Sequence, residues 1–146
     1  MPVTPTKAQE VWKEVGKNVS FVVLKLKSEN LAADQEAIAE FADRSQAIER
    51  SMMIRAADAN LKVSIGFSRT AWDYLFPNAA VPKQLETYTT LTGPESRMPA
   101  SACDIFLHVR AGDAAVVYEV VRQFMVFLEP LATVLDEKKG FRYFER

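Results

Sequence analysis

The chain has 146 residues, of which 49% are hydrophobic and 25% are charged, as expected for one soluble domain with a sizeable core. Its net charge of −1 argues against a nucleic-acid or membrane-surface partner that is held by general electrostatics. A single cysteine, Cys103, excludes an internal disulfide framework and is typical of a reducing compartment. Since neither a signal peptide nor a transmembrane stretch is predicted, we expect a cytoplasmic protein.

The first part of the chain predicts an extension followed by a strand. Residues 1–19 are mixed and polar, and a short helix is expected over residues 7–14. Residues 20–28, SFVVLKLKS, contain a stretch in which five of six side chains are apolar. This pattern predicts a strand that is buried on both faces.

A long helix, a second strand and a loop-rich stretch are expected next. Asn30 can cap a helix over residues 31–57, either unbroken or broken at residues 43–45, with apolar side chains at helical spacing (Ile38, Phe41, Ile48 and Met52). Residues 61–67, LKVSIGF, alternate between apolar and polar and predict a half-buried strand. Residues 68–102 begin with a short turn or helix and continue as a long loop, which is expected to cover the domain or to serve its function.

The last third of the chain predicts a strand, a helix and a final strand. Residues 103–111 form the third strand, and Asp113 caps the helix that follows. Pro130 should end this helix, whose apolar stripe comprises Val117, Val120, Val121, Phe124, Leu128 and Leu131. The fourth strand is expected over residues 133–144, with a bulge at Gly140.

The order of elements is β-α-β-loop-β-α-β, which is the ferredoxin-like pattern of an α+β domain. We therefore predict one ferredoxin-like domain over residues 20–146, with residues 1–19 as an N-terminal extension. Its four-stranded antiparallel sheet should carry both long helices on one face. Because the strands are apolar on both faces, the other face should be an exposed apolar surface.

His108 is the only histidine, so any chemistry that uses imidazole must depend on it. It alternates with Phe106 and Arg110 on one face of the third strand, where a structural role is the simplest interpretation. Cys103 lies five residues earlier and should point to the opposite face, which argues against a Cys-His pair. The residues alone therefore predict no catalytic site.

Other candidate sites are also incomplete. One histidine and one cysteine cannot form a structural zinc site, and GFSRT at residues 66–70 lacks the second glycine of a nucleophile elbow. The spacing of Glu36, Glu40 and Asp43 is that of a solvated helix face. Several aromatic residues are interpreted as core or interface side chains: Trp12, Trp72, Tyr74 and Tyr143.

Three stretches together resemble the N-terminal half of the bacterial dye-decolourising peroxidases. They are VSIGFSRTAWDYLFP at residues 63–77, MPASACDIFLHVRAGDAAVVYEVV from Met98, and VLDEKKGFRYFER at the C-terminal end. The second contains Asp-x-Phe-x-His-x-Arg, and the third contains the Gly-Phe-Arg-Tyr ending of the family. The resemblance extends from about Ser20 to Arg146 and is looser over residues 85–97.

The resemblance implies half of a dimeric α+β barrel type enzyme, in which two ferredoxin-like halves pack with their sheets facing. In that family heme is held mainly by the second half, and the enzyme uses hydrogen peroxide to oxidise dyes or phenolic compounds. The distal aspartate, the distal arginine and the proximal histidine all follow the segment that residues 140–146 resemble. His108 matches a strand histidine that is not the heme ligand. No catalytic, cofactor-binding or metal-binding residue is therefore carried over, and the chain alone is expected to lack heme and activity.

Three hypotheses about function follow. In the first, the chain is the first half of a peroxidase whose partner is the C-terminal half. In the second, it is a free-standing module that forms a homodimer or other homo-oligomer through its open sheet face and binds a partner without catalysis. In the third, two copies bind heme through His108.

Overall fold

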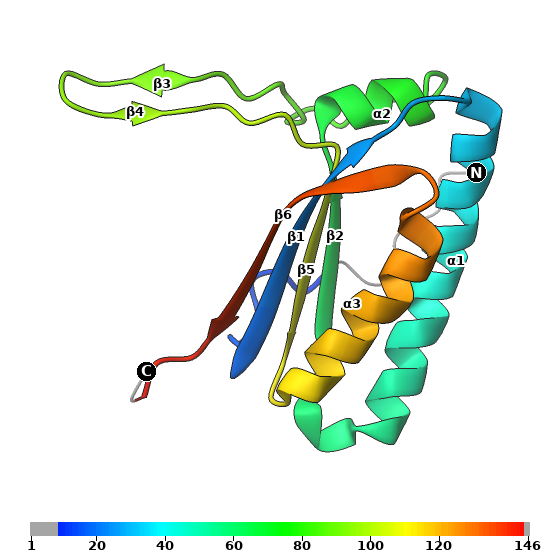
Figure 1. Ribbon diagram of the computed structural model, residues 1–146, viewed down its shortest axis with the longest axis vertical. Helices are drawn as coiled ribbons and strands as arrows, with labels where there is room; N and C mark the ends of the chain where they lie inside the picture. The colour runs from blue at the N-terminus through cyan, green and yellow to red at the C-terminus, as the bar shows by residue number, and fades with distance from the viewer. Residues whose placement is uncertain (1–8, 145–146) are drawn as a thin grey trace.

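The computed structural model describes residues 9–144 as four main strands, two long helices and several short elements (Figure 1). In the sheet, all neighbouring strands are antiparallel and their order is β2-β5-β1-β6. The elements are β1 (Asn18–Leu26), α1 (Leu31–Arg55), the 3-10 helix η1 (Ala57–Ala59), β2 (Lys62–Phe67), α2 (Arg69–Leu75), β3 (Leu91–Thr92), β4 (Arg97–Met98), β5 (Ile105–Ala111), α3 (Ala114–Leu128) and β6 (Ala132–Phe141). Figure 1 shows α1 and α3 on the same face of the sheet, so the predicted ferredoxin-like architecture is confirmed.

The core lies between the sheet and the two long helices. Alternate residues of β1 and β5, such as Leu24 and Leu107, point toward the helices and are fully buried. Phe41 of α1 meets Phe124 of α3 edge to face, with ring centroids 5.4 Å apart. Burying each large apolar side chain contributes about 1.5–3 kcal/mol. The predicted helix stripes are confirmed as buried: Ile38, Phe41, Ile48 and Met52 in α1, and Val117, Val120, Val121, Phe124 and Leu128 in α3, with Leu131 after it.

The helix ends follow the sequence signals. The side chains of Asn30 and Asp113 accept hydrogen bonds from the main-chain N–H groups of Ala33 and Ala115, at 3.1 and 2.8 Å. Helix α3 ends before Pro130, as predicted. Helix α1 is unbroken at residues 43–45, where the hydroxyl of Ser45 donates to the carbonyl of Ala42 at 3.0 Å within the helix. None of the helices within residues 9–144 is long and apolar enough to cross a membrane.

Several details of the predicted elements are wrong. Residues 10–13 form a turn, in which the N–H of Lys13 donates to the carbonyl of Glu10 at 3.2 Å, and the helix expected over residues 7–14 is not formed in residues 9–14; residues 7 and 8 lie outside the described part of the chain. Strand β5 begins at Ile105, and β6 ends at Phe141. The bulge in β6 lies opposite Val23 and Leu24 of β1 and not at Gly140. A side chain at Gly140 would place its Cβ 3.1 Å from Val19 Cγ1, so this glycine provides close strand packing.

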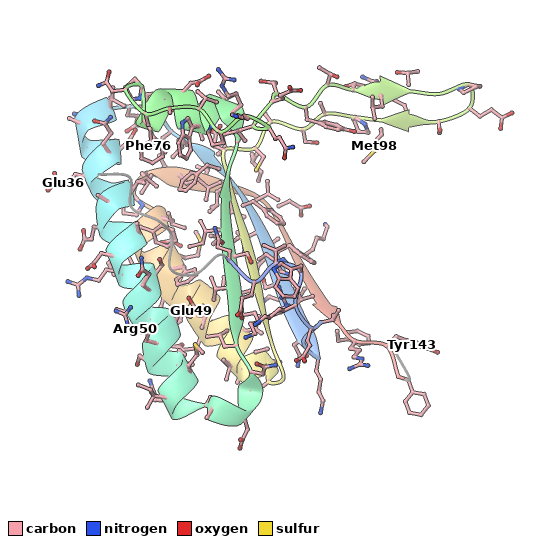
Figure 2. The ribbon with its side chains drawn as sticks, turned by 180° about the vertical axis from the view of Figure 1, so that it is seen from behind. Glu36, Glu49, Arg50, Phe76, Met98 and Tyr143 are labelled. Carbon is pink, nitrogen blue, oxygen red and sulfur yellow. The ribbon has the colours of Figure 1, made fainter. Side chains whose placement is uncertain are left out.

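The loop-rich stretch consists of α2 and a hairpin arm, which we define as residues 77–102. Figures 1 and 2 show that the arm projects away from the sheet, so the predicted covering role is not seen. Its side chains are exposed apart from Leu85. The short strands β3 and β4 pair at the tip, where the N–H of Gly93 donates to the carbonyl of Ser96 at 2.8 Å.

Candidate functional site

The face of the sheet opposite the helices carries the single histidine. Here Phe21 of β1 lies directly opposite His108 of β5, and their ring centroids are 4.7 Å apart. The ring of Phe106 also stacks against that of Phe21, with ring centroids 5.9 Å apart. The predicted common face of Phe106, His108 and Arg110 is confirmed by the register. The resulting surface is apolar and only partly covered.

His108 is held as a neutral imidazole. Burial lowers its pKa below the ordinary value, and the positive charge of Arg110 lowers the pKa further. Ser64 of β2 lies opposite His108, but no hydrogen bond joins the two side chains within residues 9–144. No carboxylate in the described part of the chain orients the imidazole, so the geometry does not form a proton relay. The face is suited to packing against another apolar surface.

Arg110 attaches the N-terminal segment, residues 9–17, to one end of this face. Its guanidinium donates to the main-chain oxygens of Glu10, Lys13 and Glu14 at 2.6, 3.0 and 2.9 Å. Sequence reasoning missed this role, although an arginine inside an apolar strand requires buried acceptors. The extension is therefore partly integrated into the domain.

The two other nucleophile candidates have structural roles. The Sγ atom of Cys103 lies 3.5 Å from the carbonyl oxygen of Ile105, and burial together with the nearby Asp104 raises the pKa of the thiol. The hydroxyl of Ser68, in the elbow-like GFSRT stretch, accepts a hydrogen bond from the N–H of Ala71 and caps α2. Neither group is activated.

The remaining candidates are distributed over separate surfaces. Glu36, Glu40 and Asp43 are exposed on α1, as predicted. Trp12 and Tyr143 are 79% and 77% exposed, so they are not core residues. Trp72 and Tyr74 are half-buried, and the Tyr74 hydroxyl donates to Asp34 at 2.8 Å.

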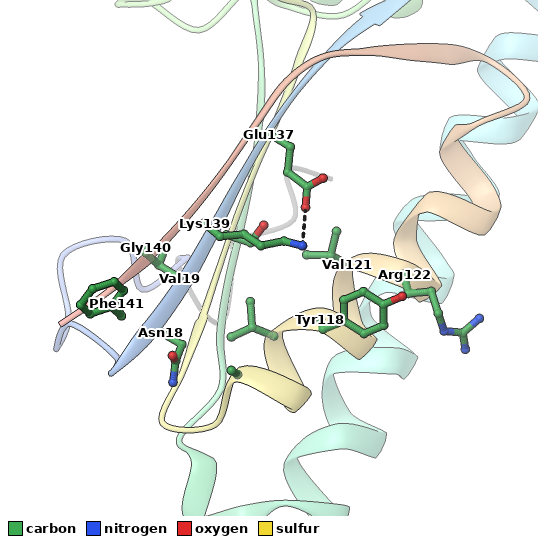
Figure 3. Close-up of a pocket in the computed structure, with 12 residues that line it drawn as sticks. Asn18, Val19, Tyr118, Val121, Arg122, Glu137, Lys139, Gly140 and Phe141 are labelled. Carbon is green, nitrogen blue, oxygen red and sulfur yellow. Dashed lines mark ion pairs between the residues drawn. The ribbon is translucent and has the colours of Figure 1, made fainter.

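A cavity of about 510 Å³ lies on the helix side of the sheet, between α3 and the outer strand β6 (Figure 3). It was not predicted from the sequence. The sequence feature that could have indicated the cavity is the polar pair Glu137 and Lys139. These residues lie on the helix side of β6, where a covering helix would require apolar residues.

A family model described as "Dyp-type peroxidase, N-terminal" matches residues 8–142. The chain belongs to this family. The Dyp-type N-terminal domain described here is 31% identical over 116 residues to the dye-decolorizing peroxidase of Mycobacterium tuberculosis, covering 79% of this chain and 34% of that protein. It is 30% identical over 125 residues to the enzyme of Brevibacterium linens, with coverage of 86% and 33%. The chain thus spans about a third of these curated relatives.

Solved structures agree with the family assignment. A dye-decolorizing peroxidase from Bacteroides thetaiotaomicron aligns with a TM-score of 0.86 and 28% identity, covering 94% of this chain and 44% of that chain. DyPB from Rhodococcus jostii aligns with a TM-score of 0.84 and 25% identity, covering 94% and 43%. A variant of DypB has been solved in complex with heme.

The residues of this Dyp-type domain do not by themselves fit a heme. The one imidazole, that of His108, packs against the ring of Phe21 on a face without an enclosing wall. A heme would need both an axial ligand and a surrounding cavity.

Proposed function

We propose that the chain acts as the first domain of a heme-dependent peroxidase, in which hydrogen peroxide drives the oxidation of dyes or small phenolic compounds. The observation that carries the proposal is the family match over residues 8–142. Further support is that the chain aligns with 44% of a solved dye-decolorizing peroxidase. In this proposal a second half of the protein binds the heme, and the role of the described domain is to support that half.

The open face of the sheet is the proposed packing surface for the second half. Phe21 and Phe106 present stacked rings on it, and neutral His108 adds no charge that would have to be desolvated. Such a partly exposed apolar patch is typical of an interaction surface. A cytoplasmic location is part of the proposal and is supported by the free thiol of Cys103.

A second candidate function is favoured by the same face. Two copies of the chain could pack through it as a two-fold dimer, which would act as a binding module without catalysis. A stable dimer should bury more than about 1,000 Å² in total, with Phe21 and Phe106 at its centre. Sedimentation at micromolar concentration separates this dimer from a monomer.

The test is to produce the chain alone and together with the C-terminal remainder of a related dye-decolorizing peroxidase. We expect the chain alone to give a weak, non-saturating spectral change with hemin and no more guaiacol oxidation than free hemin. The combined halves should bind heme stoichiometrically and oxidise guaiacol. Phe106→Glu should weaken their association, whereas Glu36→Ala on the far helix face serves as the control.

Two results would contradict the proposal. Failure of the two halves to associate would favour the free-standing module. A sharp Soret band from the chain alone at one equivalent of hemin, lost in His108→Ala, would support a heme-binding homodimer.

A further inference from the structure

We propose that the cavity between α3 and β6 is a binding site for a small aromatic carboxylate. Its volume of about 510 Å³ lies within the range of small-molecule sites, which is roughly 300–1,000 Å³. The cavity exists because α3 packs on the central strands and leaves the helix side of β6 uncovered (Figure 3). The inference does not rest on the peroxidase proposal, because the residues that carry it, Ser20, Lys139 and Val117, lie on the helix side of the sheet and not on the open face.

The cavity offers an apolar surface for the body of the ligand. Val117 and Val121 of α3 are buried side chains that form its helix wall. Tyr118 and Phe141 also line it, and both aromatic rings are largely exposed. A flat ring system bound between them would remove apolar surface of both partners from water, and aromatic contacts favour such an arrangement.

Lys139 provides a cation that is only weakly engaged. Its Nζ atom lies 3.5 Å from a carboxylate oxygen of Glu137 and 5.6 Å from the ring centroid of Tyr118. Charge-assisted hydrogen bonds are usually shorter, and an exposed ion pair of this kind contributes at most about 1 kcal/mol. A carboxylate in the cavity can therefore compete for the ammonium group. By contrast, Arg122 makes two 2.8 Å hydrogen bonds with Glu119.

Ser20 is a second donor beside Lys139. The two residues are directly paired across β1 and β6, so their side chains lie on the same face of the sheet. Ser20 lines the cavity and is 1% exposed, and its hydroxyl oxygen finds no hydrogen-bond partner within residues 9–144. A buried hydroxyl without a partner is unfavourable, and its O–H can rotate toward an acceptor. A ligand carboxylate would provide that acceptor and also neutralise Lys139.

The experiment is calorimetric titration of the full 146-residue chain with 2-naphthoate, and in parallel with 2-naphthamide, which has the same ring system without the charge. We expect one saturable site for the acid and binding of the amide that is weaker by about tenfold or more, since the amide loses the ionic contact. Lys139→Gln should weaken acid binding by about tenfold, and Ser20→Ala by about threefold, while the melting temperature shows that each variant is folded. Lys138→Gln is the matched control and should change the affinity less than about twofold, because Lys138 is directly paired with Phe21 across β1 and β6 and therefore lies on the opposite face of the sheet from the cavity.

Equal binding of acid and amide, no saturable binding, or unchanged affinity in Lys139→Gln would overturn the proposal. Loss of 2-naphthoate binding when a dimer forms at higher protein concentration would also overturn the proposal, because a second copy of the chain would then occupy the cavity. Neither hemin nor peroxide is present in the titration, so its failure is distinguishable from failure of the peroxidase proposal.

Discussion

The Nη2 atom of Arg110 lies 2.6 Å from the main-chain oxygen of Glu10, which precedes it in the chain by 100 residues. Arg110 is 2% exposed, so this contact and the two that accompany it are largely shielded from water. Lys62, on the neighbouring strand β2, forms an ion pair with the Glu10 carboxylate at 2.6 Å. The extension and one end of the sheet are therefore stabilised together.

Replacing Arg110 should detach this segment. Arg110→Met leaves three main-chain oxygens without their donor, and hydrogen bonds to a charged group contribute about 1.5–3 kcal/mol to stability. We expect a lower free energy of unfolding and faster trypsin cleavage after Lys13 and Lys17. Arg97→Met on the exposed arm should change neither quantity. Unaltered cleavage in Arg110→Met would mean that the bonds of Gln9 to the main chain of Ile65 suffice to hold the segment.

Stability should depend on pH through His108. Because burial lowers the folded-state pKa of this imidazole below 6.5, the unfolded chain takes up the proton first as the pH falls. The free energy of unfolding should therefore decrease as the pH falls from about 6.5 to the lowered folded-state pKa, and then level off. Urea unfolding between pH 5 and 8 tests this, and NMR titration of the imidazole reports the pKa directly. His108→Gln should abolish the dependence in this window.

A separate loss of stability is expected in acid. Ion pairs lower the pKa of Glu10 and of Glu119 to about 2, with Lys13 and Arg122 as their main partners. Folding favours the charged form of both carboxylates, so this contribution is present above pH 4.5 and is lost as the pH falls toward 2. His108→Gln should leave this second decrease unchanged, as acid unfolding curves would show.

The apolar stripe of α3 gives a prediction about folding. Val120 is fully buried, so Val120→Asp places a carboxylate in the core without a partner. We expect a loss of more than about 4 kcal/mol, which would leave the chain insoluble or without fixed tertiary packing. Glu36→Ala, on an exposed position of α1, should change stability by less than about 0.5 kcal/mol. A well-folded Val120→Asp protein would contradict the packing of α3.

Side-chain hydrogen bonds of Tyr74 and Gln35 join α2 to α1: the Tyr74 hydroxyl donates to Asp34, and the Gln35 amide donates to the carbonyl of Leu75 at 2.7 Å. In Tyr74→Phe the Asp34 carboxylate, which is 7% exposed, loses the donor at 2.8 Å, so the melting temperature should fall. Tyr88→Phe is the matched control, because Tyr88 is exposed on the arm. Burial and the neighbouring Asp34 raise the pKa of Tyr74, so the folded state retains this proton more tightly than the unfolded state. The wild-type protein should therefore lose stability as the pH rises above about 10, and this loss should be smaller in Tyr74→Phe.

The sequence predicted correctly those elements whose hydrophobic pattern agrees with the burial of their side chains in the structure. The 3.6-residue periodicity of residues such as Val117, Val120 and Phe124 identified α3, and Asn30 and Asp113 marked helix starts through their own side-chain chemistry. The helix expected at residues 7–14 failed because distant carbonyl contacts with Arg110 determine the path of that segment. Periodicity within one element contains no information about such a contact.

The cavity could not be predicted for a related reason. Its shape depends on how far α3 lies from β6, and this separation results from the packing of α3 on β1 and β5 and against α1. The polar character of Glu137 and Lys139 indicated only that the face was uncovered. The apolar open face, by contrast, was predictable from the two-sided hydrophobicity of β1, although its partial covering by residues 9–17 was not.

The hairpin arm is a segment in which the chain should tolerate insertions and labels. Residues 77–102 contribute none of the buried core, and the turn at its tip depends on a single main-chain hydrogen bond between Gly93 and Ser96. Insertions or a fluorescent label at Pro94 and Glu95 would extend into solvent without altering the register of the sheet. The arm is therefore the natural site for a reporter or a purification tag within the chain, leaving both sheet faces accessible.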